Sequence, residues 1–463
     1  MYVLKDACAP VSSAPISRFT CFSINPHLHV STFQHIKGTF DILPDAYTIG
    51  GTRVAAAHEW CHVEDTLRAV MQRHNLEEIR TPMLEPTELV ARGVGEHTDI
   101  VSKEMFAFER SGTNYVLRPE ITAPVTRAFL EHHLEQRGGV QKLFYIGPCF
   151  RAEQPQKGRY RQFHQFGAEI IGADEPRADA ETIAVMMAAY EAFGLQGMRL
   201  RLNTLGAPEH RAAFREALVE YLTPYKSELS ETSQRRLQSN PLRILDTKAE
   251  HEQILLQDAP TLRDFVDADA LSHYDAVKQH LSDLGVDFEE DPMLVRGLDY
   301  YSHTAFELEH DALGAQSALA GGGRYDGLAA ELGHDGPLPA CGFAAGMERL
   351  FLALDAHDYA YPDAERPRVF FAALGADAEA WVFETVHALR KRGIHAAHDL
   401  KGRSLKAQMR EANRQNAPYS VIIGGNELAD GAAQVKTMAT GEQEAVSFDE
   451  LAAYLATPPA VDA

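Results

Sequence analysis

The 463-residue sequence predicts an α+β fold with an antiparallel-sheet core, a helical insertion and a C-terminal α/β domain. The core is predicted by residues 143–172, where two runs rich in aromatic and branched side chains flank a polar tip, as in a long antiparallel hairpin. The insertion is predicted by residues 206–290, which are charged and helical in pattern without strand alternation. From residue 367 onward, short branched runs alternate with helical patterns, which is typical of an α/β domain.

The composition indicates a soluble protein with more than one domain. The length suits two or three domains, and 45% hydrophobic with 24% charged residues is typical of globular chains. No apolar run reaches the length of a membrane span. The net charge of −22 does not exclude a nucleic-acid partner, because such binding depends on local basic patches.

The five cysteines are scattered without a CxxC pair. This spacing favours a reducing, cytoplasmic compartment and argues against a disulfide framework or a cysteine-based zinc site. The residues are Cys8, Cys21, Cys61, Cys149 and Cys341.

Residues 1–34 show neither helical nor strand periodicity. They contain no apolar run of signal-peptide length and match an Arg-rich transit peptide poorly. We expect a disordered or misassigned leader, with the folded chain starting at the phrase KGTFDILPD.

A helix is predicted between residues 51 and 74, where apolar side chains recur at three- and four-residue steps. Residues 76–86 suit a strand that Pro82 ends. The helix also contains HExxH at residues 58–62, so zinc-protease chemistry is an alternative. Trp60 belongs to the apolar face of this helix, which would turn the two histidines towards solvent. Because the chain also has 21 histidines, we favour a chance match and expect no metal site.

A group of polar residues follows a strand predicted to end at Leu117. Pro119 and Pro124 indicate a turn and a helix start, with Thr122 close to the N-cap position. A cap explains Thr122 but leaves Glu120 unexplained. Both residues are therefore candidates for binding a ligand.

The hairpin, with strands expected at 143–151 and 162–171, carries further candidate residues. Arg151 ends the first strand, and Gln165 and Glu169 lie four residues apart on the second, so the pleat puts both on one face. We interpret Arg151 as holding an anionic phosphate, and Gln165 and Glu169 as holding a cationic or hydrogen-bonding ligand. A solvated hairpin whose charges face water is the alternative.

Residues 294–307 place Arg296 before a pair of tyrosines, Tyr300 and Tyr301. A strand built only for packing would not bury these groups. The glycine-rich phrase AGGGRYDGL at 320–328 lacks both the P-loop and the Rossmann spacing, so its glycines indicate a close approach of the backbone to a ligand or a neighbouring strand.

Residues 340–352 are typical of a small-residue strand that enters a helix, with Arg349 in the first turns of that helix. An ordinary surface arginine is the alternative. The C-terminal domain carries a local basic excess, opposed only by Asp399 and Glu411, that would suit a phosphate backbone or a solvated helix face. Its residues are Arg390, Lys391, Arg392, Lys401, Arg403, Lys406, Arg410 and Arg414.

These stretches resemble, in order, the motifs of one enzyme family. The hairpin is similar to motif 2 of the class II aminoacyl-tRNA synthetases, the preceding helix and strand to motif 1, and residues 340–352 to motif 3. The phrases LRPEIT at 117–122 and LVRGLDYYSHTAFE at 294–307 resemble sequences of histidyl-tRNA synthetases. The chain is identified as a member of that family over about residues 36–455, with the class II synthetase fold.

The resemblance implies a domain order. A leader (1–34) precedes the first part of the catalytic core (35–205), the helical insertion (206–290), the second part of the core (291–360) and an anticodon-binding domain (367–463).

The resemblance also implies ligation of L-histidine to tRNA(His) through a histidyl-adenylate, with ATP and Mg²⁺, in a cytoplasmic homodimer without a membrane partner. Arg296 and Arg151 would be catalytic. ATP would be bound by Arg151, Glu153 and Arg349. Histidine would be bound by Glu120, Thr122, Arg151, Gln165, Glu169, Arg296, Tyr300 and Tyr301, and the tRNA acceptor end would contact Gln154, Gln156 and Lys157.

A catalytically inactive paralogue, acting as the regulatory subunit of ATP phosphoribosyltransferase, is the alternative. That group generally lacks the C-terminal domain and loses motif residues. Because Arg151, Arg296 and Arg349 all remain here, we favour the enzyme.

Overall fold

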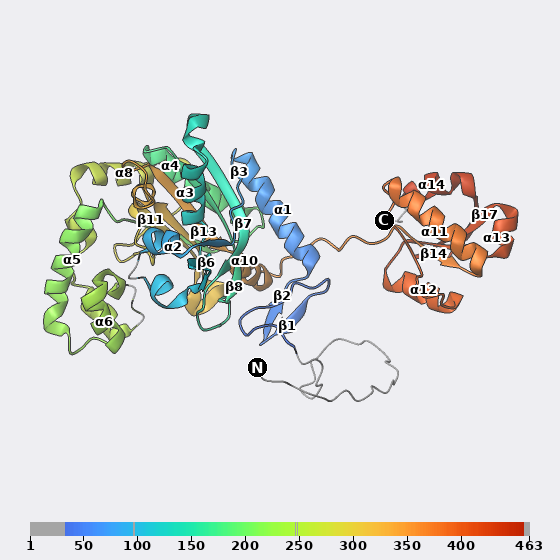
Figure 1. Ribbon diagram of the computed structural model, residues 1–463, viewed down its shortest axis with the longest axis horizontal. Helices are drawn as coiled ribbons and strands as arrows, with labels where there is room; N and C mark the ends of the chain where they lie inside the picture. Colours follow the sequence, from blue (N-terminus) through green and yellow to red (C-terminus); the bar gives the residue numbers. More distant parts are fainter. Residues whose placement is uncertain (1–32, 96–97, 246, 248, 458–463) are drawn as a thin grey trace. The chain divides into compact units, whose positions relative to one another are not determined.

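The computed structural model describes residues 33–95, 98–245, 247 and 249–457 (Figure 1). The chain divides into two compact units, one ending at Tyr361 and the other beginning at Pro362. The predicted leader lies almost wholly outside the described residues.

The first unit is built on an eight-stranded sheet in the order β10-β9-β11-β12-β13-β8-β7-β3. Neighbours from β9 to β7 pair antiparallel, and only the edge strands β10 and β3 pair in parallel. The antiparallel core is therefore confirmed. The strands are β3 (Glu77–Glu78), β7 (Gln141–Phe150), β8 (Gln162–Ile171), β9 (Met198–Thr204), β10 (Glu289–Glu290), β11 (Ser302–His310), β12 (Ala318–Arg324) and β13 (Ala340–Gly346).

The long hairpin is confirmed as β7 and β8, which pair along their whole length. Arg151 lies one residue beyond β7. The alternation along β8 sends Phe166 and Ala168 into the main hydrophobic core and leaves Gln165 and Glu169 on the opposite face.

Helices cover the core face of this sheet. Apolar residues of four helices pack together with Phe166 in one buried cluster. These helices are α1 (Ala57–Arg73), α4 (Pro176–Glu191), α8 (Ala268–Asp283) and α10 (Met347–Ala356). The other face is covered in part by α3 (Thr122–Glu131), whose Val125 and Phe129 pack against Tyr145 of β7.

The predicted helical stretch consists of helices joined by short 3₁₀ turns. Phe214, Leu218 and Leu222 of its first helix belong to the same buried cluster as Tyr145 and Tyr300. In Figure 1, α5 and α6 lie at the end of the unit opposite α1. The helices are α5 (Pro208–Leu222), α6 (Glu231–Ser239), α7 (Glu250–Leu256) and α8. Their separate status as a module from 206 to 290 stays a prediction.

A small sheet, β4-β6-β5, lies beside the large one. The prediction of one strand over residues 76–86 ended by Pro82 is wrong, because the chain crosses here from one sheet to the other. Arg118 fixes the crossing, since its Nη1 donates to the Thr81 carbonyl at 2.8 Å and its Nε to the Pro148 carbonyl at 2.9 Å. The elements are β4 (Leu84–Pro86), α2 (Thr87–Val94), β5 (Phe106–Arg110) and β6 (Thr113–Leu117), and a hairpin of β1 (Tyr47–Ile49) and β2 (Thr52–Val54) precedes α1.

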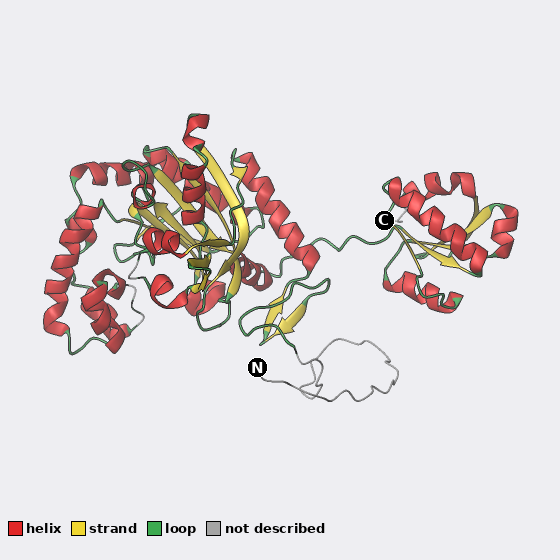
Figure 2. Ribbon diagram, in the orientation of Figure 1, coloured by secondary structure: helices red, strands yellow, loops and turns green. Residues whose placement is uncertain are grey.

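The second unit confirms the predicted α/β domain (Figure 2). Its sheet has the order β15-β14-β16-β17-β18, parallel from β15 to β16 and antiparallel beyond. Phe371 packs with α11 and α14 on one face, and Phe370 with Ala412 of α12 on the other. The elements are β14 (Val369–Ala373), α11 (Ala376–Lys391), β15 (Ala396–His398), α12 (Leu405–Arg414), β16 (Tyr419–Ile423), α13 (Gly425–Asp430), β17 (Ala432–Thr437), β18 (Gln443–Ser447) and α14 (Phe448–Ala456).

Two of the three HExxH side chains of α1, Glu59 and His62, are engaged with protein partners. Glu59 pairs with Arg53 at 2.6 Å and accepts from the Ala56 N–H at 2.7 Å. The His62 Nε2 lies 2.9 Å from the Tyr359 hydroxyl. Over the described ranges, none of the helices combines the length and apolar character needed to cross a membrane.

Candidate active site

The candidate site lies on the sheet face opposite the main core, where the central strands β12 and β13 present mostly glycine and alanine. A Cβ at Gly342 would lie 1.7 Å from the Glu169 Oε2, and one at Gly321 would lie 2.2 Å from the Arg296 Nη2. Only glycine leaves room for these two side chains. The glycine-rich stretches thus leave space on this face of the sheet for charged side chains from neighbouring segments.

Glu169 is completely buried on this face of the sheet and accepts hydrogen bonds from three hydroxyl groups. The Thr122 Oγ1 donates to its Oε1 at 2.7 Å, the Tyr145 hydroxyl to Oε1 at 3.3 Å, and the Tyr325 hydroxyl to Oε2 at 2.5 Å. Burial raises the pKa of the Glu169 carboxyl to about 8 despite these donors. Because its position is fixed, this carboxyl group can select a ligand ring by the position of that ring's hydrogen-bonding groups.

Thr122 is the first residue of α3 and lies one residue after the N-cap position, Ile121, as predicted. The acceptor for the free N–H groups is the Glu120 carboxylate, which accepts from the backbone N–H groups of Thr122 at 2.7 Å and Ala123 at 3.0 Å. This frees the Thr122 hydroxyl for Glu169. Burial nevertheless raises the pKa of Glu120, opposed by these N–H groups and by Arg151.

Gln165 lies on the same face as Glu169, where its Oε1 accepts from the Cys149 thiol at 3.3 Å. Tyr300 and Tyr301 pack ring to ring at 4.5 Å, and Tyr300 lies 5.7 Å from the ring of Tyr325. Aromatic rings thus line one side of the site and polar acceptors the other.

Arg296 enters the site from the loop before β11. Its Nη1 pairs with the Glu307 Oε2 at 2.7 Å, and its guanidinium lies 5.6 Å above the ring of Tyr301. Burial disfavours its charge, but Glu307 outweighs that effect and raises the Arg296 pKa. Among the described residues its buried Nε has no hydrogen-bond partner. A buried guanidinium with an unused donor suits an anionic ligand.

Arg349 is held by backbone on two sides, since it donates to the carbonyls of Ala318 and Gly158. Its pKa is lowered by burial and by Arg159, against the carboxylates of Glu307 and Glu153. Glu307 is thus a neighbour of both Arg296 and Arg349.

Arg151 completes the set of arginines. Its Nε donates to the Pro119 carbonyl at 3.0 Å, and its guanidinium lies 5.2 Å from the Phe163 ring centre. The predicted ATP-binding residue Glu153 pairs with Arg159 at 3.2 Å. The positive charge of Arg159 also contributes to lowering the pKa of Arg349. Arg151 also acts on Glu104, which has Glu153 and Arg159 as further neighbours, and Arg349 lies near Arg159, Glu153 and Glu307. Because Glu307 pairs with Arg296, these shared neighbours link the three arginines.

The hairpin tip between β7 and β8 is exposed at Gln154, Gln156 and Lys157. Its base is fixed to the start of the described chain, because the Arg161 N–H donates to the Gly38 carbonyl at 2.7 Å. The predicted acceptor-contact residues are thus open to a large partner.

Three residues of the site were missed by the sequence interpretation: Tyr145, Tyr325 and Glu307. Tyr145 faces Gly167 across the hairpin, and a Cβ at Gly167 would lie 2.5 Å from the Tyr145 hydroxyl. Tyr325 follows the three glycines of AGGGRYDGL, and Glu307 ends LVRGLDYYSHTAFE. A glycine opposite a tyrosine on paired strands was the available signal.

Comparisons with known proteins identify the family of the chain. The family model described as histidyl-tRNA synthetase matches residues 53–350, and that of the anticodon binding domain matches residues 368–457. A histidine–tRNA ligase of Chloroherpeton thalassium is 48% identical over 435 residues, which covers 93% of this chain and 99% of the relative. One from Synechococcus sp. strain JA-3-3Ab is 46% identical over 423 residues, covering 91% and 98%.

Among solved structures, the crystal structure of apo histidyl-tRNA synthetase from S. aureus matches with a TM-score of 0.75 and 37% identity, covering 92% of this chain and 100% of the other. Because the family model spans more than half of the chain and the relatives match it over nearly their whole length, this chain belongs to the histidyl-tRNA synthetase family.

Proposed function

We propose that the protein joins L-histidine to tRNA(His) in two steps. In the first, an oxygen of the histidine carboxylate attacks the α-phosphorus of ATP, so that histidyl-adenylate forms and pyrophosphate leaves. In the second, a hydroxyl of the terminal ribose attacks the activated carbonyl and AMP leaves. The observation that carries the proposal is the grouping of three arginines beside a buried glutamate on one glycine-lined sheet face.

The imidazole is recognised by Glu169 and Tyr301. A neutral imidazole has one N–H donor and one acceptor nitrogen, so it needs an acceptor and a donor from the protein. Glu169 accepts from the N–H and the Tyr301 hydroxyl donates to the other nitrogen, while Tyr300 packs beside them. A wrong side chain would leave these buried groups unpaired, which is a strong basis for rejection.

The α-ammonium of histidine is held by Glu120, Thr122 and Gln165. An ammonium carries three donors and these side chains offer three acceptors. Carboxylates and hydroxyls have lone pairs beyond those used in the contacts described above, so the same residues can serve both roles.

The three arginines stabilise the charge that develops during adenylate formation. Arg151 holds the α-phosphate, Arg349 the γ-phosphate, and Arg296 lies between the carboxylate and the α-phosphate. Fixed cations in a site of low dielectric constant need no reorganisation as charge grows on the phosphoryl oxygens. Glu153 contacts the nucleotide from the hairpin.

Magnesium enters with the nucleotide, as a Mg–ATP substrate whose leaving pyrophosphate it neutralises. Magnesium commonly binds through substrate phosphates with one or two carboxylates. The part of the chain that the structure describes has no cluster of three or more His, Cys, Asp or Glu residues arranged to hold a metal.

The tRNA contacts the protein at the hairpin tip through Gln154, Gln156 and Lys157 and at the second unit. There Lys401, Lys406 and Arg410 are exposed, whereas Asp399 and Glu411 both pair with Arg403. A homodimer formed through the helix and strand of motif 1, and a cytoplasmic location, complete the proposal.

Charging of tRNA(His) with labelled L-histidine tests the proposal. The purified chain should produce acid-precipitable label only when ATP, histidine and tRNA(His) are all present. A regulatory subunit of ATP phosphoribosyltransferase would bind histidine without charging tRNA, so absence of charging by folded protein would overturn the proposed reaction.

A further inference from the structure

The stretch AGGGRYDGL contains Arg324, a charged residue that the site described above does not use. At the end of β12, Arg324 and Tyr325 are adjacent and their side chains go to different sides. The Tyr325 hydroxyl donates to Glu169 in the histidine site. Arg324 turns away from that site towards Asp179 of α4.

Arg324 is fixed by a full set of partners although it is almost completely buried. Its Nε and Nη2 both donate to the Asp179 carboxylate, and its Nη1 donates to the Ala173 carbonyl at 2.9 Å and to the Asp326 Oδ1 at 3.2 Å. A buried ion pair with complete, bidentate hydrogen bonding has one favoured geometry. The backbone on the N-terminal side of Tyr325 is therefore held rigidly.

Tyr325 is held from its other side as well. Its N–H donates to the Ala340 carbonyl at 2.8 Å, and the Ala340 N–H donates to the Asp326 Oδ1 at 2.8 Å. The position of the Tyr325 hydroxyl, and with it that of Glu169, follows from these anchors.

Asp179, the partner of Arg324, is itself contacted by a residue from the helical stretch that spans α5 to α8. The His273 Nε2 of α8 lies 3.3 Å from the Asp179 Oδ2 and donates to it, because an ionised carboxylate only accepts. Burial would raise the Asp179 pKa, but His273 and Arg324 outweigh burial and lower it, which keeps the carboxylate ionised.

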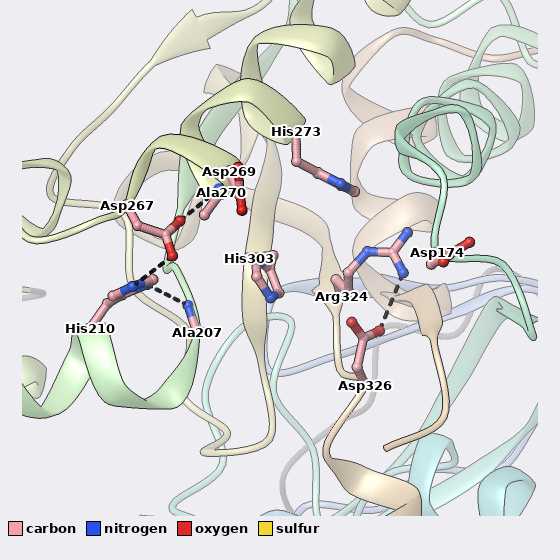
Figure 3. A pocket seen from close by; sticks show the side chains of 10 residues that line it. All are labelled: Asp174, Ala207, His210, Asp267, Asp269, Ala270, His273, His303, Arg324 and Asp326. Atoms are coloured by element: carbon pink, nitrogen blue, oxygen red, sulfur yellow. Dashed lines mark hydrogen bonds and ion pairs between the residues drawn. The ribbon is translucent and has the colours of Figure 1, made fainter. Parts of the chain in front are cut away.

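Figure 3 shows the surroundings of this contact. A polar cavity of about 260 Å³ lies between the starts of α5, α8 and β11 and the end of β12. His273 extends from α8 towards the Arg324 guanidinium, and the ring of His303 lies 6.1 Å from that of His273 (Figure 3). The next residue, Tyr274, donates from its hydroxyl to the Leu202 carbonyl of β9 at 3.2 Å, and Val277 and Leu281 pack in the main core. His273 therefore adds a polar contact beside the cavity to a helix that also packs on the sheet.

We propose that His273 is a positioning residue for the histidine site, acting through Asp179, Arg324 and Tyr325 on Glu169. The helices of the insertion thereby contribute to selection of the amino acid, although none of their side chains needs to touch it. The inference rests on the proposed role of Glu169 in reading the imidazole.

The test is histidine-dependent ATP–pyrophosphate exchange with the full chain and the variants His273→Ala and His273→Gln. His273→Ala should raise the histidine KM by about threefold and leave the ATP KM unchanged, a modest coupling of the size seen for residues that act at a distance. His273→Gln should restore the histidine KM, because its amide N–H can donate to Asp179. His280→Ala, about two turns further along α8, is the matched control and should leave both constants unchanged.

Two results would overturn the inference: an unchanged histidine KM in His273→Ala, or equal increases in the KM values of histidine and ATP. Glu169→Ala, measured alongside, separates this failure from a failure of the proposed function. If Glu169→Ala raises the histidine KM and His273→Ala does not, the positioning role alone is wrong. If neither variant changes it, the role of Glu169 is wrong too.

Discussion

Glu169 shows how a single residue can be costly for the fold and useful for the chemistry. A carboxyl group without solvent contact is destabilised in its ionised form, and three hydroxyl donors offset only part of that cost. Such a group is best explained by a ligand that completes its hydrogen bonding. The buried Nε of Arg296, which has no hydrogen-bond partner among the described residues, is likewise best explained by a bound anion.

Glu169→Ala should therefore act on histidine and not on ATP. Loss of the acceptor removes recognition of the imidazole N–H, so we expect the histidine KM to rise by at least tenfold, a loss typical of a buried polar contact, with little change in the ATP KM. Pyrophosphate exchange at varied histidine and ATP measures both constants. Equal changes in the two would remove the assigned role.

The raised pKa of Glu169 predicts a pH dependence of stability. The ordinary value is 4.5 and the folded-state value is about 8, so between these pH values the folded chain holds a proton that the unfolded chain has lost. Stability relative to Glu169→Gln, which cannot titrate, should fall by several kcal/mol as pH rises from 4.5 to 8 and then level off. Urea unfolding of both proteins across this range is the measurement, and a difference that does not vary with pH would contradict the burial argument.

Arg296→Ala should slow adenylate formation far more than it weakens ATP binding. Removing a fixed cation that acts on the developing charge commonly lowers kcat by two to three orders of magnitude, roughly the effect of losing one oxyanion donor. We expect that loss in pyrophosphate exchange with the ATP KM nearly unchanged. Arg349→Ala is the comparison, because loss of the γ-phosphate contact should raise the ATP KM. Normal exchange by Arg296→Ala would defeat the proposal.

At the scale of elements, the pattern of the hairpin was sufficient to predict β7 and β8 to within two residues. Two aromatic and branched runs around a polar tip leave few alternatives, and a period of two residues also put Gln165 and Glu169 on one face, as observed. The glycines of β12 and β13 could be recognised as close-approach positions, but not the side chains that they make room for.

Other elements could not be predicted because long-range contacts decide them. The segment around Pro82 is divided between two sheets by Arg118, which lies 36 residues away in the chain. At the start of α3, Thr122 lies next to the N-cap position as predicted, but the capping acceptor is the Glu120 carboxylate, and the Thr122 hydroxyl donates to the distant Glu169. The three hydroxyl partners of Glu169 come from three separate segments, α3, β7 and the residue after β12, which no local pattern brings together.

The hairpin tip should matter for tRNA and not for the adenylate. Gln156→Ala with Lys157→Ala removes two exposed polar side chains of the tip, so the tRNA KM should rise severalfold, as for loss of one or two phosphate or base contacts. Steady-state charging measures this effect. Pyrophosphate exchange is the internal control, and an equal loss in both assays would place the tip in the first step instead.

At the scale of the whole molecule, all the residues that we propose for adenylate formation lie in the first unit, and the second unit carries the exposed basic residues Lys401, Lys406 and Arg410. The chain as a whole has a net charge of −22. Local charge of opposite sign to the total is what allows an acidic protein to bind a polyanion. We therefore expect the first step to depend on residues of the first unit alone.

The most direct measurement of the central claim is ATP–pyrophosphate exchange by the purified full chain, with each standard amino acid supplied in turn and no tRNA present. The account predicts exchange with L-histidine and none above background with the others, because only an imidazole satisfies Glu169 and Tyr301 together. Exchange that is absent with histidine in a folded preparation, or equally strong with another amino acid, would contradict it.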